Sequence, residues 1–133
     1  MKKKQILELP FNSTTQYRAS VLCTDAGNLS IEVYLLDDQD RPKPHALKFL
    51  GPRAFRQRSE AYCKAWHIES ALDTVCEIEG SDWVSELRRD CYEMWKDAWV
   101  MRHFLIFLSD FGCVEVVAQD VRMEALALSE ALG

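Results

Sequence analysis

The chain has 133 residues, which fits one domain with a single core, because a domain of this size buries roughly two thirds of its unfolded surface. Charged residues make up 28% of the sequence and aromatic residues 11%, a composition that excludes disorder over most of the length. The formal net charge of −5 argues against general nucleic-acid binding, which requires a positive surface.

The sequence contains neither a membrane span nor a secretion signal. No apolar run approaches the roughly 18 residues that cross a bilayer. The start, MKKKQILELPF, lacks the apolar stretch and the cleavage site of a signal peptide. The five cysteines are odd in number, widely spaced and without a C-x-x-C pair, which predicts reduced thiols. We therefore expect a cytoplasmic protein that does not contact a membrane.

Charge is distributed unevenly along the chain. Residues 1–76 carry 11 Lys or Arg and 9 Asp or Glu, a balance of +2, whereas residues 77–133 carry 5 and 12, a balance of −7. If the fold keeps the halves apart, this predicts two electrostatically distinct surfaces. The alternative is that both are ordinary solvated faces.

The first third of the chain predicts strands. Residues 1–15 are irregular or form an edge strand, since Pro10 interrupts their apolar run. Apolar residues then alternate with polar ones from Tyr17 to Thr24 and from Leu29 to Leu35. The residues between these stretches, DAGN, favour a hairpin turn because Gly and Asn tolerate positive φ.

The middle of the chain is less regular. A charged loop at residues 37–44 precedes a short strand at residues 45–50. Residues 53–66 show helical spacing, but an alternating pattern keeps a strand as the competing interpretation. Residues 71–79 slightly favour a strand.

The last third predicts two helices around a hairpin. Ser81 can cap a helix whose apolar stripe continues to Ala98. Residues 103–119 then read as a β-hairpin with a fully buried first strand, the best candidate for the centre of the sheet. Helix-forming residues at 123–132 predict a short closing helix. Together these elements predict a single α+β domain over residues 1–133, with a mainly antiparallel sheet and two or three helices packed on one face.

No catalytic, metal-binding or cofactor motif accompanies these elements. The three histidines have no further ligands at metal spacing. Cysteine–histidine–aspartate triples can be assembled, but none carries a local catalytic signature. The two triples are Cys63, His67, Asp73 and Cys113, His103, Asp110. We expect His103, Asp110 and Glu115 to occupy rim and turn positions.

A basic cluster and two aromatic residues are the best candidates for binding. On a helix, Arg53 and Arg56 would share one side and could hold a phosphate or an acidic partner. Trp95 and Trp99, four residues apart, would form an aromatic ridge. The predicted binding residues are Arg53, Arg56, Arg58, Trp95, Trp99, Asp110 and Glu115.

Two segments carry a resemblance to known proteins. The segment SDWVSEL and the later HFLIFLSDFGCVEVVA resemble small bacterial α+β proteins, some of which are immunity partners of secreted toxins. The resemblance covers about residues 72–120. It implies a binding role without catalysis, because immunity proteins occlude the active site of a toxin.

Three functional hypotheses follow. The first is a non-enzymatic domain that binds a protein partner, in its narrower form a toxin. The second is a domain that binds a small ligand or nucleotide through the arginine cluster. The third is a Cys/His enzyme. The sequence indicates no oligomeric state.

Overall fold

The computed structural model describes residues 2–92 and 99–128 and consists mainly of antiparallel strands in two sheets. The first sheet, sheet A, has the strand order β1-β6-β7-β8-β5, and sheet B has the order β2-β3-β4-β9. The strands of sheet A are β1 (Lys2–Glu8), β5 (Ala54–Arg58), β6 (Thr74–Glu79), β7 (Arg102–Leu108) and β8 (Gly112–Ala118). The strands of sheet B are β2 (Gln16–Asp25), β3 (Asn28–Leu36), β4 (Pro42–Leu50) and β9 (Asp120–Ala125).

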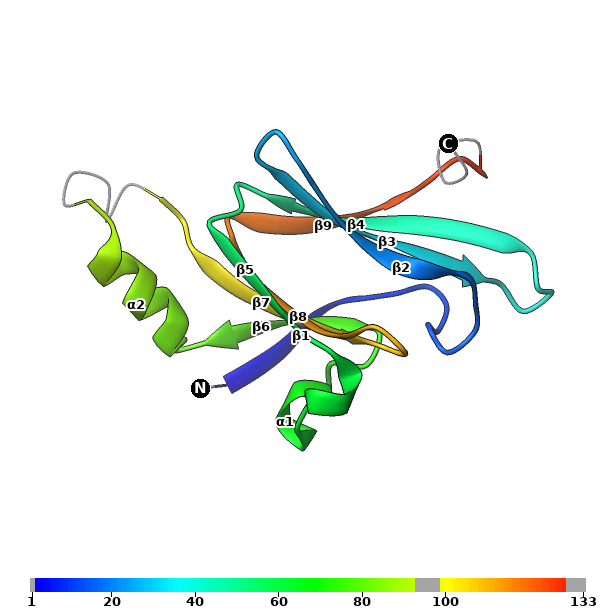
Figure 1. Cartoon of the computed structure of the whole chain (residues 1–133), viewed down its shortest axis with the longest axis horizontal. Helices are drawn as coiled ribbons and strands as arrows, with labels where there is room; N and C mark the ends of the chain where they lie inside the picture. Colours follow the sequence, from blue (N-terminus) through cyan, green and yellow to red (C-terminus); the bar gives the residue numbers. More distant parts are fainter. Residues whose placement is uncertain (1, 93–98, 129–133) are drawn as a thin grey trace.

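The main core lies between the two sheets, which pack face to face (Figure 1). Ile31 and Leu47 of sheet B and Phe104 and Ile106 of sheet A belong to one buried cluster. Strand β7 is the middle strand of sheet A, as the sequence predicts, and its other side chains are buried on the opposite face of the sheet. Burial on both faces explains why this strand is an unbroken apolar run.

A second, smaller cluster lies on the outer face of sheet A. It includes Leu105, Phe107 and Cys113, with Trp66 packed against it. The helical elements are the 3-10 turn η1 (Glu60–Tyr62), the single-turn α1 (Ala65–Ile68) and α2 (Asp82–Asp90). Both α1 and α2 pack against β7, so they cover two parts of this outer face.

The prediction of one sheet with two or three packed helices is wrong. In the described residues α2 is the one helix longer than a single turn, and nine strands form two sheets. Residues 120–125, part of which we expected to be helical, form β9 and pair with β4. Val121 and Met123 pack against the main core from this strand. Strand pairing and burial therefore override the helix propensity of the segment.

The predicted helix at 53–66 is also wrong, and the competing strand interpretation is correct for its first part. Residues 54–58 form β5 along the free edge of β8, with Arg56 opposite Glu115 and Arg58 opposite Cys113. Gly112 permits this close approach, because a Cβ there would lie 2.1 Å from the carbonyl oxygen of Arg58. The helix predicted from Ser81 begins as expected but ends at Asp90. Residues 93–98, including Trp95, lie outside the described residues.

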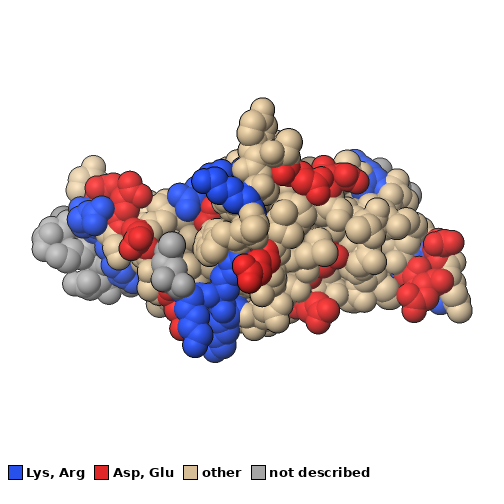
Figure 2. Space-filling model, turned by 90° about the horizontal axis from the view of Figure 1, so that it is seen from below, with Lys and Arg blue, Asp and Glu red and all other residues tan. Residues whose placement is uncertain are grey.

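The fold does not separate the basic and acidic halves of the chain. Sheet A places β5 from the first half beside β8 from the second, and sheet B places β4 beside β9. Ion pairs consequently join the halves, as between Arg56 and Glu115 and between Lys48 and Glu124. Figure 2 shows compact groups of basic side chains near the middle of one face and acidic side chains spread along its length. The two separate charged surfaces that composition suggested do not form on this face.

Candidate functional site

A cleft of about 690 Å³ lies over the outer face of sheet A, lined by residues of α1, α2 and three strands. Helix α1 contributes Trp66 and His67, and α2 contributes Trp83 among others. The volume of the cleft is within the range of small-ligand sites, about 300 to 1,000 Å³. The cleft is the candidate functional site because it combines this volume with aromatic and charged lining residues.

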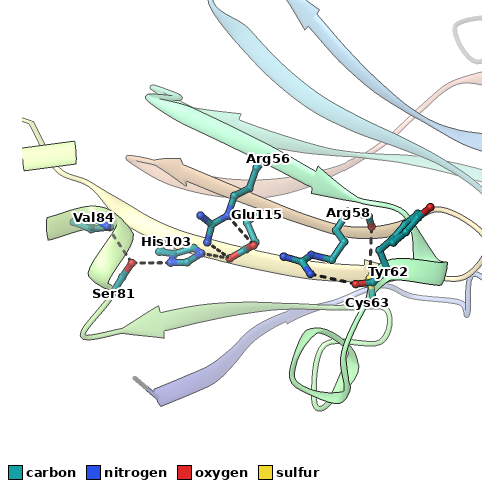
Figure 3. A network of polar contacts seen from close by, with 8 residues as sticks. All are labelled: Arg56, Arg58, Tyr62, Cys63, Ser81, Val84, His103 and Glu115. Atoms are coloured by element: carbon teal, nitrogen blue, oxygen red, sulfur yellow. Dashed lines mark hydrogen bonds and ion pairs between the residues drawn. The ribbon is translucent and has the colours of Figure 1, made fainter. Parts of the chain in front are cut away.

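The floor of the cleft is a continuous chain of polar contacts (Figure 3). Ser81 Oγ lies 2.7 Å from His103 Nδ1, and His103 Nε2 lies 2.8 Å from Glu115 Oε1. Arg56 completes the chain by donating from Nε and Nη2 to the two oxygens of Glu115, at 2.9 and 3.1 Å. Because a carboxylate only accepts hydrogen bonds, the His103 proton facing Glu115 lies on Nε2.

Strand register brings these side chains together. His103 of β7 and Glu115 of β8 lie on the outer face of sheet A, where they are diagonal neighbours on adjacent strands. Arg56 of β5 is directly opposite Glu115. Ser81 caps α2, where its Oγ accepts a hydrogen bond from the Val84 backbone N–H at 3.1 Å. The chain therefore ties three strands to the first turn of α2.

The ionisable residues in this chain of polar contacts are buried. His103 is 3% exposed and Glu115 is 6% exposed, so the prediction that they occupy rim positions is wrong. Burial by itself would raise the pKa of Glu115, but hydrogen bonds from His103 and Arg56 and the charge of Arg56 outweigh it and lower the pKa to about 2. Glu115 consequently stays ionised at neutral pH.

Each tryptophan of the cleft is held by a cation from sheet A. The Arg56 guanidinium lies 4.1 Å from the Trp83 ring, whose edge also meets His103 at a centroid distance of 5.2 Å. Lys3 Nζ lies 4.6 Å from the Trp66 ring and donates to the backbone carbonyl oxygen of Trp66. These contacts fix both rings before any ligand arrives.

The predicted binding residues fall in several places. Arg56, Arg58 and Glu115 meet at the cleft. Arg53 does not share a side with Arg56, because the segment is a strand rather than a helix. It lies instead beside a separate hollow at the β2–β3 turn, with its guanidinium 4.2 Å from the Trp99 ring. Asp110 is an exposed residue of the β7–β8 turn with φ of +61°.

Sequence reasoning missed four residues of the site. These are Trp66, His67, Ser81 in its contact with His103, and Trp83. A usable signal was present in β7 and β8, where the polar residues His103 and Glu115 fall on the same side of otherwise apolar strands. A polar pair at that spacing on a buried hairpin needs partners, and those partners mark the site.

Neither cysteine–histidine–aspartate triple is assembled. His67 Nδ1 accepts from the Lys64 backbone N–H, and Asp73 accepts hydrogen bonds from Ser13. His103 contacts Ser81 and Glu115, and burial raises the pKa of Cys113 to about 12. In residues 2–92 and 99–128 no group of three or more His, Cys, Asp or Glu side chains could hold a metal ion.

Comparison of the chain with known protein families, curated proteins and solved structures gives no match. The resemblance of residues 72–120 to immunity proteins stays a prediction. None of the helices in the described part of the chain has the length and apolar character to cross a membrane.

Proposed function

We propose that this protein is a non-enzymatic binding domain that receives a segment of a protein partner in the cleft between α1 and α2. The observation that carries the proposal is a pair of tryptophans, each braced by a cation, above a floor whose charges already have partners. Tryptophan and arginine are the residue types that contribute most to protein-binding energy. A preformed cleft lowers the entropic cost of binding.

The floor supports a structural role for its charges rather than acid–base chemistry. Ser81, His103 and Glu115 contain the groups of a serine hydrolase triad. However, Ser81 Oγ already accepts the Val84 N–H, and Glu115 is bound by both nitrogens of the Arg56 fork. The Ser81 hydroxyl is thus part of the cap of α2, and the two-point contact with Arg56 holds Glu115 in place as a structural anion.

The narrower form of the proposal is an immunity-type inhibitor of a toxin, acting in the cytoplasm. The two segments that carry the resemblance meet at this cleft: SDWVSEL provides the cap and first turns of α2, and HFLIFLSDFGCVEVVA provides β7 and β8. All five cysteines are free, which is compatible with a reducing compartment.

Calorimetry with the purified products of genes adjacent to the gene of this protein tests the proposal. We expect one of them to bind, and Trp83→Ala to weaken that binding at least about tenfold. Trp83→Phe keeps an aromatic ring and serves as the second variant if Trp83→Ala does not fold. The matched control is Phe55→Ala, which removes a 45% exposed aromatic side chain outside the cleft lining. Absence of binding by every neighbour, or equal loss in Phe55→Ala, would contradict the proposal.

A small anionic ligand is the second candidate, favoured by the cleft volume and by Arg56 and Arg58 in its lining. A thermal-shift screen with nucleotides and phosphorylated metabolites distinguishes it from the first. A rise in melting temperature that Arg58→Ala abolishes would favour the small ligand. No rise with any compound would count against it.

A further inference from the structure

His67 presents a hydrogen-bond donor whose position follows from its other contact. Its Nδ1 lies 2.9 Å from the backbone N–H of Lys64 and accepts that hydrogen bond. A neutral imidazole carries one proton, so the proton of His67 lies on Nε2. Burial, followed by the charge of Arg58, lowers the pKa of His67, which keeps the ring neutral at pH 7.

The Nε2 donor of His67 has no hydrogen-bond partner among the described residues. The residue is 7% exposed and lines the cleft. Within residues 2–92 and 99–128, the hydrogen bond between Nδ1 and the Lys64 backbone N–H is the only one that the ring nitrogens make. Tyr17 Oη, and not His67 Nε2, is the unsatisfied side-chain atom shut off from solvent in the described residues, so Nε2 opens onto the cleft, where an entering acceptor can take its hydrogen bond.

Arg58 adds a positive charge at the same end of the cleft. Its Nη1 donates to the Tyr62 carbonyl oxygen at 3.2 Å, which holds the guanidinium near η1 (Figure 3). It makes no ion pair with any residue in 2–92 or 99–128, whereas its neighbour Arg56 is neutralised by Glu115. The remaining N–H groups of Arg58 are therefore available to a ligand.

The surrounding charges favour an anion at this end. Arg58 and Lys3 both act on His67 as positive charges, and Glu115, the opposing carboxylate, is bound by Arg56 and His103. The acidic lining residues Asp82 and Glu86 belong to α2, on the other wall. The β5 and α1 side thus has donors and positive charge without an acidic lining residue, whereas Arg89 of α2 shares its wall with the two carboxylates.

We infer that the β5 and α1 side of the cleft is a carboxylate subsite, in which an acidic group of the protein partner accepts hydrogen bonds from Arg58 and from His67 Nε2–H. Guanidinium and imidazole N–H groups bind carboxylates through charge-assisted hydrogen bonds. This inference rests on the proposed function, because it assigns the chemistry of the partner segment that the cleft receives.

NMR titration of the full chain with small carboxylates tests the inference. N-acetylaspartate amide imitates an acidic side chain, N-acetylglycine imitates a chain terminus, and inorganic phosphate is the competing anion, all at constant ionic strength. We expect one or both carboxylates to shift the His67 ring signals saturably and to raise the His67 pKa by about half a unit or more, since a bound anion favours the imidazolium. The signals of His45 should not change.

Variants of Arg58 separate specific binding from a general salt effect. Arg58→Gln should weaken carboxylate binding about tenfold, the loss expected for a charged hydrogen bond, and Arg58→Lys should restore part of it. Arg53→Gln is the matched control, because Arg53 is another exposed arginine but lies outside the cleft lining. It should bind like the wild type.

Three results would overturn the inference: no saturable shift at His67, equal binding by Arg58→Gln and wild type, or binding of phosphate without binding of either carboxylate. Failure of the subsite is distinguishable from failure of the proposed function. Partner binding that depends on Trp83 but not on Arg58 would contradict the subsite alone. Carboxylate binding without any protein partner would contradict the proposed function alone.

Discussion

The outer faces of the two sheets carry the same type of ion pair in different surroundings. On sheet A, Arg56 pairs with Glu115, whose side chain is 8% exposed beneath the cleft. On sheet B, Lys48 pairs with Glu124 at 2.8 Å, and both side chains are more than a third exposed. The helices α1 and α2 pack against strand β7 of sheet A. The comparison shows that burial, rather than the pairing itself, distinguishes the ion pair in the candidate site from an ordinary cross-strand ion pair.

The energetic consequence of this difference is large. An exposed ion pair contributes little because water and salt screen it. Breaking a buried ion pair by removing one partner lowers the free energy of unfolding of the protein by several kilocalories per mole. Variants that affect one face and not the other therefore measure how far the two faces differ.

Removal of the Glu115 carboxylate should have the largest effect. Glu115→Ala leaves His103 and Arg56 without their shared acceptor, and we expect the free energy of unfolding to fall by about 3 kcal/mol or more. Urea denaturation measures the change. Glu124→Ala on sheet B is the control, and its effect should be close to the error of the measurement and should vanish at high salt. Equal effects of the two variants would remove the distinction between the faces.

The pH dependence of Glu115→Gln should give the next largest effect. The pKa of Glu115 is about 2 in the folded protein, below its ordinary value of 4.5, so ionisation of this group stabilises the folded state. The contribution, of the order of 2 to 3 kcal/mol, is fully present above about pH 4.5 and is lost as the pH falls through about 2. The difference in unfolding free energy between wild type and variant should shrink across that window. A difference that does not change with pH would show that Glu115 is not held as an anion.

Ser81→Ala should have a smaller but measurable effect. The change removes both the cap of α2 and the hydroxyl partner of His103, and we expect a loss of about 1 to 2 kcal/mol in thermal or urea unfolding. Ser85→Ala, one turn later and exposed, is the matched control and should change stability by less than about 0.5 kcal/mol. If both variants behave alike, α2 is not anchored to sheet A through His103.

Several elements of the fold could be predicted because local patterns and tertiary packing agree. The hairpins around residues 25–28 and 109–111, the strand at 74–79 and the cap at Ser81 belong to this group. In each, alternation or capping chemistry already favours the conformation that burial rewards. Of the site residues, Arg56, Arg58 and Glu115 were found as individual candidates but not as neighbours.

Two elements could not be predicted because the local signals were divided. Residues 53–66 fit both a helical and an alternating pattern, and the free edge of β8 decided in favour of β5 for residues 54–58. Residues 120–125 contain strong helix formers, yet pairing with β4 and burial of Val121 and Met123 made them a strand. Only a partner strand distant in the sequence supplies the hydrogen bonds that decide such cases.

The sequence alone determined the buried central hairpin, the alternating strands of the first third and the capped start of α2, because these depend on periodicity and on contacts between near neighbours. Tertiary structure decided the two-sheet architecture and the cleft. It placed Arg56, from the basic half of the chain, against Glu115, from the acidic half, and covered the pair with helices that also carry Trp66 and Trp83. Register between distant strands sets those contacts, and a charge distribution read along the chain cannot contain that information.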